Sequence, residues 1–72
     1  MDKFAGRLKE LRLERNLYQK DVAEGIGMSR VITTQMESGG RKPTSTTIIK
    51  LCNFFDVSSD YLLGLSDDRT RR

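Results

Sequence analysis

Arg30 and Gln35 carry side chains whose hydrogen-bonding groups match the edges of base pairs. A guanidinium can donate two hydrogen bonds to O6 and N7 of guanine, and a carboxamide can pair with N6 and N7 of adenine. Val31 and Thr34 lie between them and offer methyl groups that can pack on the methyl group of thymine. The same four residues would also suit an ordinary polar helix face, so their meaning depends on the elements that hold them.

Basic residues are concentrated in the middle of the chain. The net charge is only +3, but residues 29–50 carry four basic residues against Glu37, whereas residues 51–68 carry four acids and no base. This distribution is consistent with one face turned toward a polyanion, although charge alone fits a solvated mosaic better. Arg41 and Lys42 lie in a segment with glycines and Pro43, which suits either a phosphate-contacting loop or a solubilising one.

The composition argues against several kinds of active site. The chain has no histidine and a single cysteine, Cys52. An internal disulfide, a histidine-based zinc site and a Ser-His-Asp triad are therefore impossible. No phosphate-cradling glycine loop is present either. We expect no enzymatic activity, no metal and no cofactor, and we expect Cys52 to be a small core residue.

Length and hydropathy favour one soluble domain inside the cell. The 72 residues are enough for a single domain with a thin core. The charged start lacks the apolar stretch of a signal peptide, and no run approaches the ~20 apolar residues of a membrane span. We therefore expect a cytoplasmic location and no membrane partner.

Apolar spacing predicts an all-α, compact five-helix domain. The expected helices cover residues 3–16, 19–26, 30–37, about 45–55 and 59–63. Phe4, Leu8 and Leu11 share one face of the first helix. The fourth helix, capped by Thr44 or Ser45, has an apolar stripe of Ile48, Leu51, Cys52 and Phe55. No segment shows the alternation of a strand with a partner.

The second and third helices are separated by a tight turn. Ala23 supplies the small side chain needed where two helices cross, and Gly27 supplies a residue free to adopt positive φ. Ile26 and Met28 flank the turn with apolar side chains, and Ser29 can cap the next helix. This arrangement is a helix-turn-helix.

These segments resemble the Cro/CI-type (XRE-type) helix-turn-helix domain of phage repressors. The resemblance covers about residues 5–65 and is carried by Gln19-Lys20-Asp21-Val22-Ala23, Ile26-Gly27-Met28-Ser29-Arg30 and Met36-Glu37-Ser38-Gly39. It implies a lambda-repressor-like fold and binding to double-stranded DNA. Two positions depart from the pattern. Tyr18 replaces the usual capping Ser or Thr, and Thr33 replaces a buried aliphatic residue, so either Thr33 is buried with its hydroxyl bonded to the helix or the helix is rotated.

The resemblance also implies roles in DNA binding for particular residues. It implies that Gln19 binds a backbone phosphate and that Arg12 pairs with Glu37 inside the domain. Tyr18 either donates to a phosphate or packs against the protein. The predicted DNA-contacting residues are Tyr18, Gln19, Ser29, Arg30, Val31, Thr34, Gln35, Arg41 and Lys42.

The C-terminal part is expected to mediate dimerisation. Phe54, Tyr61, Leu63 and Leu65 provide more apolar surface than one short helix can bury, although they could instead close the core. A homodimer would place two recognition helices about 34 Å apart and bind a palindromic operator. We expect a DNA-binding domain over residues 1–66 and a charged tail over residues 67–72.

The leading functional hypothesis is a sequence-specific transcriptional regulator, a repressor acting as a homodimer, encoded by a bacterium or phage and associated with the nucleoid. A helix-turn-helix antitoxin, or a restriction-modification controller that can also activate, is the alternative. A helical bundle that binds only proteins is a third hypothesis. It predicts that Arg30 and Gln35 are dispensable for activity.

Overall fold

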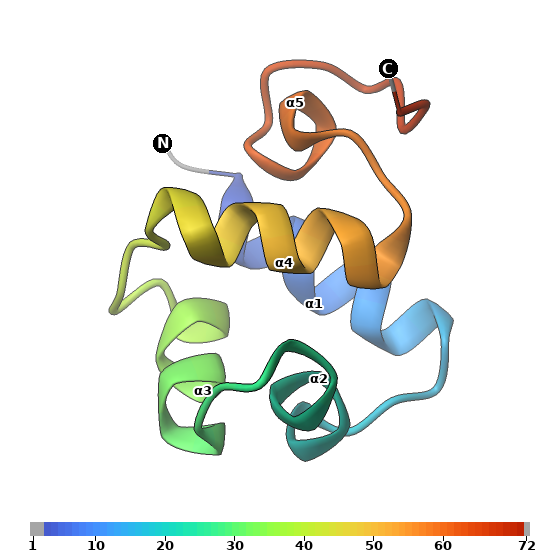
Figure 1. The fold of residues 1–72 in the computed structure, drawn as a ribbon. Coiled ribbons are helices and arrows are strands. Elements are labelled where there is room, and N and C mark those ends of the chain that lie inside the picture. Colours follow the sequence, from blue (N-terminus) through green and yellow to red (C-terminus); the bar gives the residue numbers. More distant parts are fainter. Residues whose placement is uncertain (1–2, 72) are drawn as a thin grey trace.

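The protein is an assembly of five α-helices in a computed structural model that describes residues 3–71 (Figure 1). No β-strand occurs within this range. The predicted all-α, five-helix class is thus confirmed, with helix ends within two residues of the expected ones. The helices are α1 (Phe4–Glu14), α2 (Gln19–Ile26), α3 (Arg30–Ser38), α4 (Ser45–Phe55) and α5 (Ser59–Leu62).

Two helices form the centre of the fold and three are arranged around them. In Figure 1, α4 crosses in front of α1, with α2 and α3 together at one end and α5 at the other. α1 packs against α3 and α5, and α4 packs against α2 and α5. The paired helices α2 and α3 therefore rest on a support made by α1 and α4.

The core follows the predicted apolar stripes with one change. Phe4, Leu8 and Leu11 are buried, as their spacing predicts. In α4, Ile48 packs against the core as expected but is only half-buried, and Thr47 is buried beside it, so the expected full burial of Ile48 is corrected. Thr47 fits because its hydroxyl shares a 3.1 Å hydrogen bond with the Thr44 hydroxyl. A hydrogen bond of this kind offsets most of the free energy that it costs to remove a hydroxyl from water.

Three helices begin at the capping residues that the sequence predicts. The hydroxyl of Ser29 accepts from the amide of Ile32, and the hydroxyl of Ser58 accepts from the amide of Tyr61. Of the two candidate caps for α4, Thr44 is the one used. Each bond satisfies an amide that the helix itself leaves unpaired, which fixes where the helix starts.

Gly25 lies in the interior of α2, where glycine costs about 1 kcal/mol relative to alanine. The ring of Phe54 explains its presence. A Cβ atom placed on Gly25 would lie 2.1 Å from Cε1 of Phe54. The missing side chain thus lets the Phe54 ring of α4 pack directly on the α2 backbone, with its edge against Phe55 at a centroid distance of 4.9 Å.

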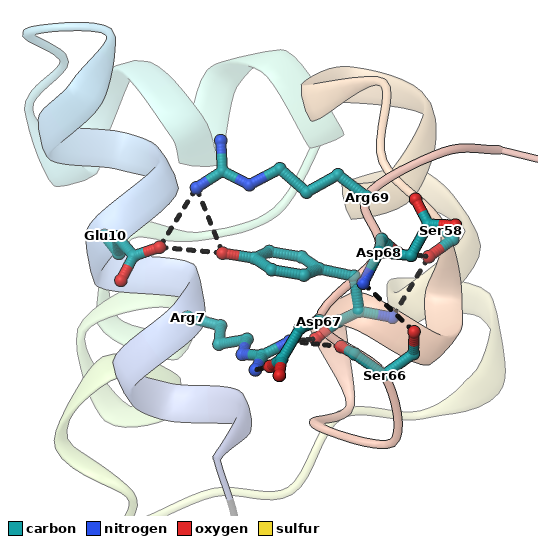
Figure 2. A network of polar contacts seen from close by, with 8 residues as sticks. Arg7, Glu10, Ser58, Ser66, Asp67, Asp68 and Arg69 are labelled. Atoms are coloured by element: carbon teal, nitrogen blue, oxygen red, sulfur yellow. Dashed lines mark hydrogen bonds and ion pairs between the residues drawn. The ribbon is translucent and has the colours of Figure 1, made fainter.

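Residues 67–71, expected to form most of a charged tail, have no helix or strand but lie against the domain. Arg69 bonds Glu10, Glu14 and the hydroxyl of Tyr61, at 3.0, 2.6 and 3.0 Å. Arg7 bonds Asp67 at 2.6 Å. The C-terminal segment is thereby tied to α1 and α5 (Figure 2). Arg72, the last expected residue of the tail, lies outside the described residues, as do residues 1 and 2.

Candidate nucleic-acid interface

The turn between α2 and α3 has the geometry that its sequence predicts. Gly27 has a φ of 69°, in the left-handed region that glycine adopts without steric cost. The amide of Met28 bonds the carbonyl of Ala23 at 2.9 Å, which closes the end of α2. Ala23 is buried, as a small residue at a helix crossing is expected to be. Ser29 then caps α3, so the outer face of α3 is held in a fixed direction.

That outer face is made of the residues predicted to reach base edges. Arg30, Val31 and Thr34 are exposed and Gln35 is half-buried. On the inner face, Thr33 and Met36 are buried, and the Thr33 hydroxyl donates to the carbonyl of Ser29 at 3.3 Å. The first alternative for Thr33 is therefore confirmed, and α3 is not rotated away from the expected face.

Gln19, expected to bind phosphate, is half-buried and bridges the two helices. Its Oε1 accepts a hydrogen bond from the Thr34 hydroxyl at 2.7 Å, and its Nε2 lies 3.5 Å from Oε1 of Glu37. This side chain is committed to α3 in the free protein. A phosphate at this end of α2 would have to be held mainly by the backbone amides or by neighbouring cations.

A pocket at the start of α2 brings such cations together. It is lined by Arg12, Tyr18, Gln19, Lys20 and Arg30. Tyr18 is 70% exposed, and its side chain does not cap the helix; instead its backbone amide donates to Asp21 at 2.7 Å. The positive end of the helix dipole, together with Lys20 and Arg30, makes this hollow suitable for an anion, whereas the charge of Arg12 is paired with Glu37.

Lys20 is the residue of this pocket that sequence reasoning overlooked. Its ammonium group lies 5.8 Å from the centre of the Tyr18 ring, within cation–π range. A lysine in the first turn of the helix that precedes a recognition helix is a signal that could have identified it.

Arg12 and Glu37 form the internal ion pair that the family resemblance implies, which confirms that expectation. Nε of Arg12 bonds Oε2 of Glu37 at 2.7 Å, and Nη2 bonds Oε1 at 3.0 Å. The hydrogen bond to Glu37 raises the pKa of Arg12 above its ordinary value. The pair links α1 to α3 and neutralises an acid that would otherwise repel DNA phosphates.

The loop after α3 carries the two remaining predicted contacts. Arg41 and Lys42 are both exposed. The loop starts beside α3 because the amide of Gly40 bonds the carbonyl of Gln35 at 2.9 Å. Nε of Arg41 then donates to Oε1 of Gln35 at 2.8 Å. Arg41 is therefore placed next to the outer face of α3.

The expected apolar surface is only partly present. Leu65 is 76% exposed and Leu63 is half-buried, whereas Phe54 packs over Gly25. The expected exposure of Tyr61 is wrong, because the residue is only 5% exposed.

The guanidinium carbons of Arg7 and Arg69 lie 4.1 and 4.8 Å from the centre of the Tyr61 ring. Figure 2 shows the two arginines on opposite sides of it. Tyr61 thus belongs to the interior of the domain.

The part of the chain that the structure describes contains no helix long and apolar enough to cross a membrane. Among the same residues, no group of three or more Cys, Asp or Glu side chains is placed to hold a metal ion.

Comparison with known proteins agrees with this geometry. A family model described as helix-turn-helix matches residues 8–62. The uncharacterised HTH-type transcriptional regulator YqaE of Bacillus subtilis is 40% identical over 67 residues, which cover 92% of this chain. The cryptic phage CTXphi transcriptional repressor RstR of Vibrio cholerae is 37% identical over 64 residues, or 89% of the chain. The chain spans 58% of the length of each of these two relatives.

A solved structure shows the same fold. The restriction-modification controller protein C.AhdI from Aeromonas hydrophila superposes with a TM-score of 0.78 and 33% sequence identity. The match covers 83% of this chain and 91% of C.AhdI. The arrangement of helices around the α2–α3 turn is thus one that a regulatory protein uses.

Proposed function

The chain belongs to the helix-turn-helix family of transcriptional regulators, in its XRE-type branch, and on this premise we propose that it binds specific DNA sequences through α3. The observation that carries the proposal is the outer face of α3. Arg30, Val31 and Thr34 are exposed there, on a helix whose start is capped by Ser29. The N-terminal residues of such a helix reach base edges in the major groove. Relatives that are regulators also agree with the expected lack of enzymatic activity.

Phosphate contacts on both sides of α3 would orient the domain on the duplex. The start of α2 offers Lys20 on one side, and the loop offers Arg41 and Lys42 on the other. Phosphate contacts of this kind fix register without reading sequence. They also make affinity fall as salt rises, because each neutralised phosphate releases counterions.

We infer further that the protein represses transcription as a homodimer on a palindromic operator. The exposed Leu65 and its half-buried neighbour Leu63 supply an apolar surface near the end of α5. Phe54 is half-buried and would contribute a contact at the edge of this dimer interface. Two-fold symmetry would set the two α3 helices about one helical turn of DNA apart.

Selection of bound sequences from a random DNA pool, followed by affinity measurements, tests the proposal. We expect a symmetric consensus, and we expect Arg30→Ala to weaken binding by about 1–3 kcal/mol with loss of preference at one base pair. Lys9→Ala, which removes an exposed charge from α1, is the matched control and should weaken binding much less. A protein that shows no sequence preference, or an Arg30→Ala variant that binds as the unmodified protein does, would contradict the proposal.

The likeness to C.AhdI favours a second candidate, a restriction-modification controller that can also activate transcription. A reporter gene placed behind the selected operator separates the two. Repression at every protein concentration supports the first candidate, and activation at low concentration supports the second.

A further inference from the structure

The contact between Arg41 and Gln35 fixes which end of the Gln35 carboxamide faces the loop. Nε of Arg41 lies 2.8 Å from the side-chain oxygen of Gln35. A guanidinium has only hydrogen-bond donors, so the atom that faces it must be the amide oxygen. The amide nitrogen, which has two donor hydrogens, is consequently turned away from Arg41.

The backbone keeps these two residues together. The carbonyl of Gln35 accepts hydrogen bonds from the amide of Gly40 and the hydroxyl of Ser38, both at 2.9 Å. Gly39 ends α3 with a φ of 84°, which turns the chain back toward Gln35. The loop therefore turns back on leaving α3, which brings Arg41 beside the side chain of Gln35 in the last turn of the helix.

From this geometry we propose that Arg41 sets the hydrogen-bonding polarity of Gln35. A glutamine that pairs with adenine must present its oxygen to N6 and its nitrogen to N7 at the same time. The amide oxygen has two lone pairs, so it can accept from Arg41 with one and from N6 of adenine with the other, which lies on the side of the amide nitrogen. Arg41 thus holds Gln35 in the orientation that reads adenine and disfavours the flipped orientation, which would offer donors to guanine or thymine. The inference rests on the proposed function, because it assumes that α3 enters the major groove.

Arg41 can do this while it contacts the DNA backbone. Its Nε group is engaged by Gln35, but its terminal nitrogens are not needed for that bond, and Arg41 is exposed. A planar guanidinium has enough donors to serve a phosphate on one edge and an amide on another. Lys42, the next residue, is equally exposed and basic, and the structure gives it no hydrogen bond to Gln35. Lys42 is thus a natural control for charge alone.

The test uses the operator obtained by selection. The base pair read by Gln35 is the one at which Gln35→Ala loses discrimination. Dissociation constants are then measured for the unmodified protein, Arg41→Ala and Lys42→Ala on four duplexes that differ only at that pair. Circular dichroism confirms that each variant is folded.

We expect the unmodified protein to prefer adenine over guanine or thymine by about tenfold. Arg41→Ala should weaken binding and bring this ratio toward one, because the freed carboxamide can flip and present its donors to guanine or thymine. Lys42→Ala should weaken binding to all four duplexes by a similar factor. In a Gln35→Ala background, Arg41→Ala should likewise act equally on all four.

Three results would overturn the inference and leave the proposed function intact. The unmodified protein could prefer guanine or thymine at this pair, Arg41→Ala could change the four affinities in parallel, or Gln35→Ala could lose discrimination nowhere. Failure of the unmodified protein to bind any duplex at low ionic strength would instead overturn the proposed function, and the inference with it.

Discussion

Arg12 and Glu37 join α1 to α3 through two hydrogen bonds, and their side chains are only 11 and 4% exposed. Arg12 also donates to the carbonyl of Leu17 at 2.8 Å, just before α2 begins. One guanidinium therefore ties α1 both to α3 and to the segment that leads into α2. Removing one member of such a buried ion pair is costly, because the remaining charge is left without a counter-ion and is shielded from water.

We predict that Glu37→Gln lowers the free energy of unfolding by about 3 kcal/mol. The substitution keeps the shape of the side chain but leaves the Arg12 charge without its counter-ion. Urea denaturation followed by circular dichroism measures the change. Asp56→Asn is the matched control, since it breaks an exposed pair with Arg71 at 3.6 Å and should cost less than about 1 kcal/mol. Equal losses in the two variants would contradict the prediction.

Gly25→Ala should destabilise the protein although alanine favours helices. The added methyl group would collide with the Phe54 ring, which approaches to 2.1 Å of its position. Gly6→Ala in α1 is the control, because a Cβ atom there meets nothing within 4 Å. That change should stabilise the protein by about 0.5–1 kcal/mol.

A double substitution isolates the cause of the Gly25 effect. In a Phe54→Ala background, where the ring is gone, Gly25→Ala should become neutral or stabilising. Thermal unfolding of the four proteins gives the coupling between the two sites. If Gly25→Ala is equally harmful with and without the ring, crowding by Phe54 is not the reason for the glycine.

The contact between Arg69 and Glu14 should weaken in acid. The hydrogen bond to Arg69 holds the pKa of Glu14 below its ordinary value of 4.5. A carboxyl with a lowered pKa stabilises the fold above the unfolded value and loses that contribution as the pH falls through the folded one. The difference in stability between the unmodified protein and Arg69→Ala should therefore shrink from pH 6 to about pH 3.

Unfolding in urea at a series of pH values measures this difference. Lys9→Ala provides the comparison, because Lys9 lies on the same helix and forms no ion pair among the described residues. A difference between the unmodified protein and Arg69→Ala that stays constant with pH would show that the carboxylate is not what holds Arg69.

The thiol of Cys52 should be unreactive in the folded protein. Cys52 is buried in α4, and burial raises its pKa above the ordinary 9.0. Little thiolate is present at pH 8, and the sulfur is shielded from reagents. We expect a disulfide reagent such as DTNB to react many times more slowly with the folded protein than with glutathione, and to react readily once urea unfolds the chain. A rate close to that of glutathione in buffer would contradict the burial.

Local signals explain why so much of the helix-turn-helix unit can be predicted from sequence. Gly27, Ser29 and Thr44 act within one turn of their own position, so their residue types are enough to place helix ends. The outer face of α3 follows from its helical period once its start is known. Thr33 is consistent with this, because its hydroxyl finds a partner inside its own helix.

The features that sequence reasoning missed are contacts between distant segments. No local pattern indicates that the Phe54 ring will rest on Gly25, so the glycine looks like a weakness and the phenylalanine like exposed surface. Tyr61 was misplaced for the same reason, since Arg7 and Arg69 reach it from opposite ends of the chain. The orientation of Gln19 toward Thr34 likewise depends on how α2 crosses α3.

Ser58 connects the beginning of α5 to the C-terminal segment. Its hydroxyl donates to the carbonyl of Asp68 at 3.0 Å, and its amide donates to the carbonyl of Arg69 at the same distance. A fragment that keeps these contacts must therefore extend through Arg69. A truncated version that stops at Leu65 would lose both bonds of Ser58 and the cover that Arg69 gives to the Tyr61 ring, and proteases should cut it faster than the longer chain.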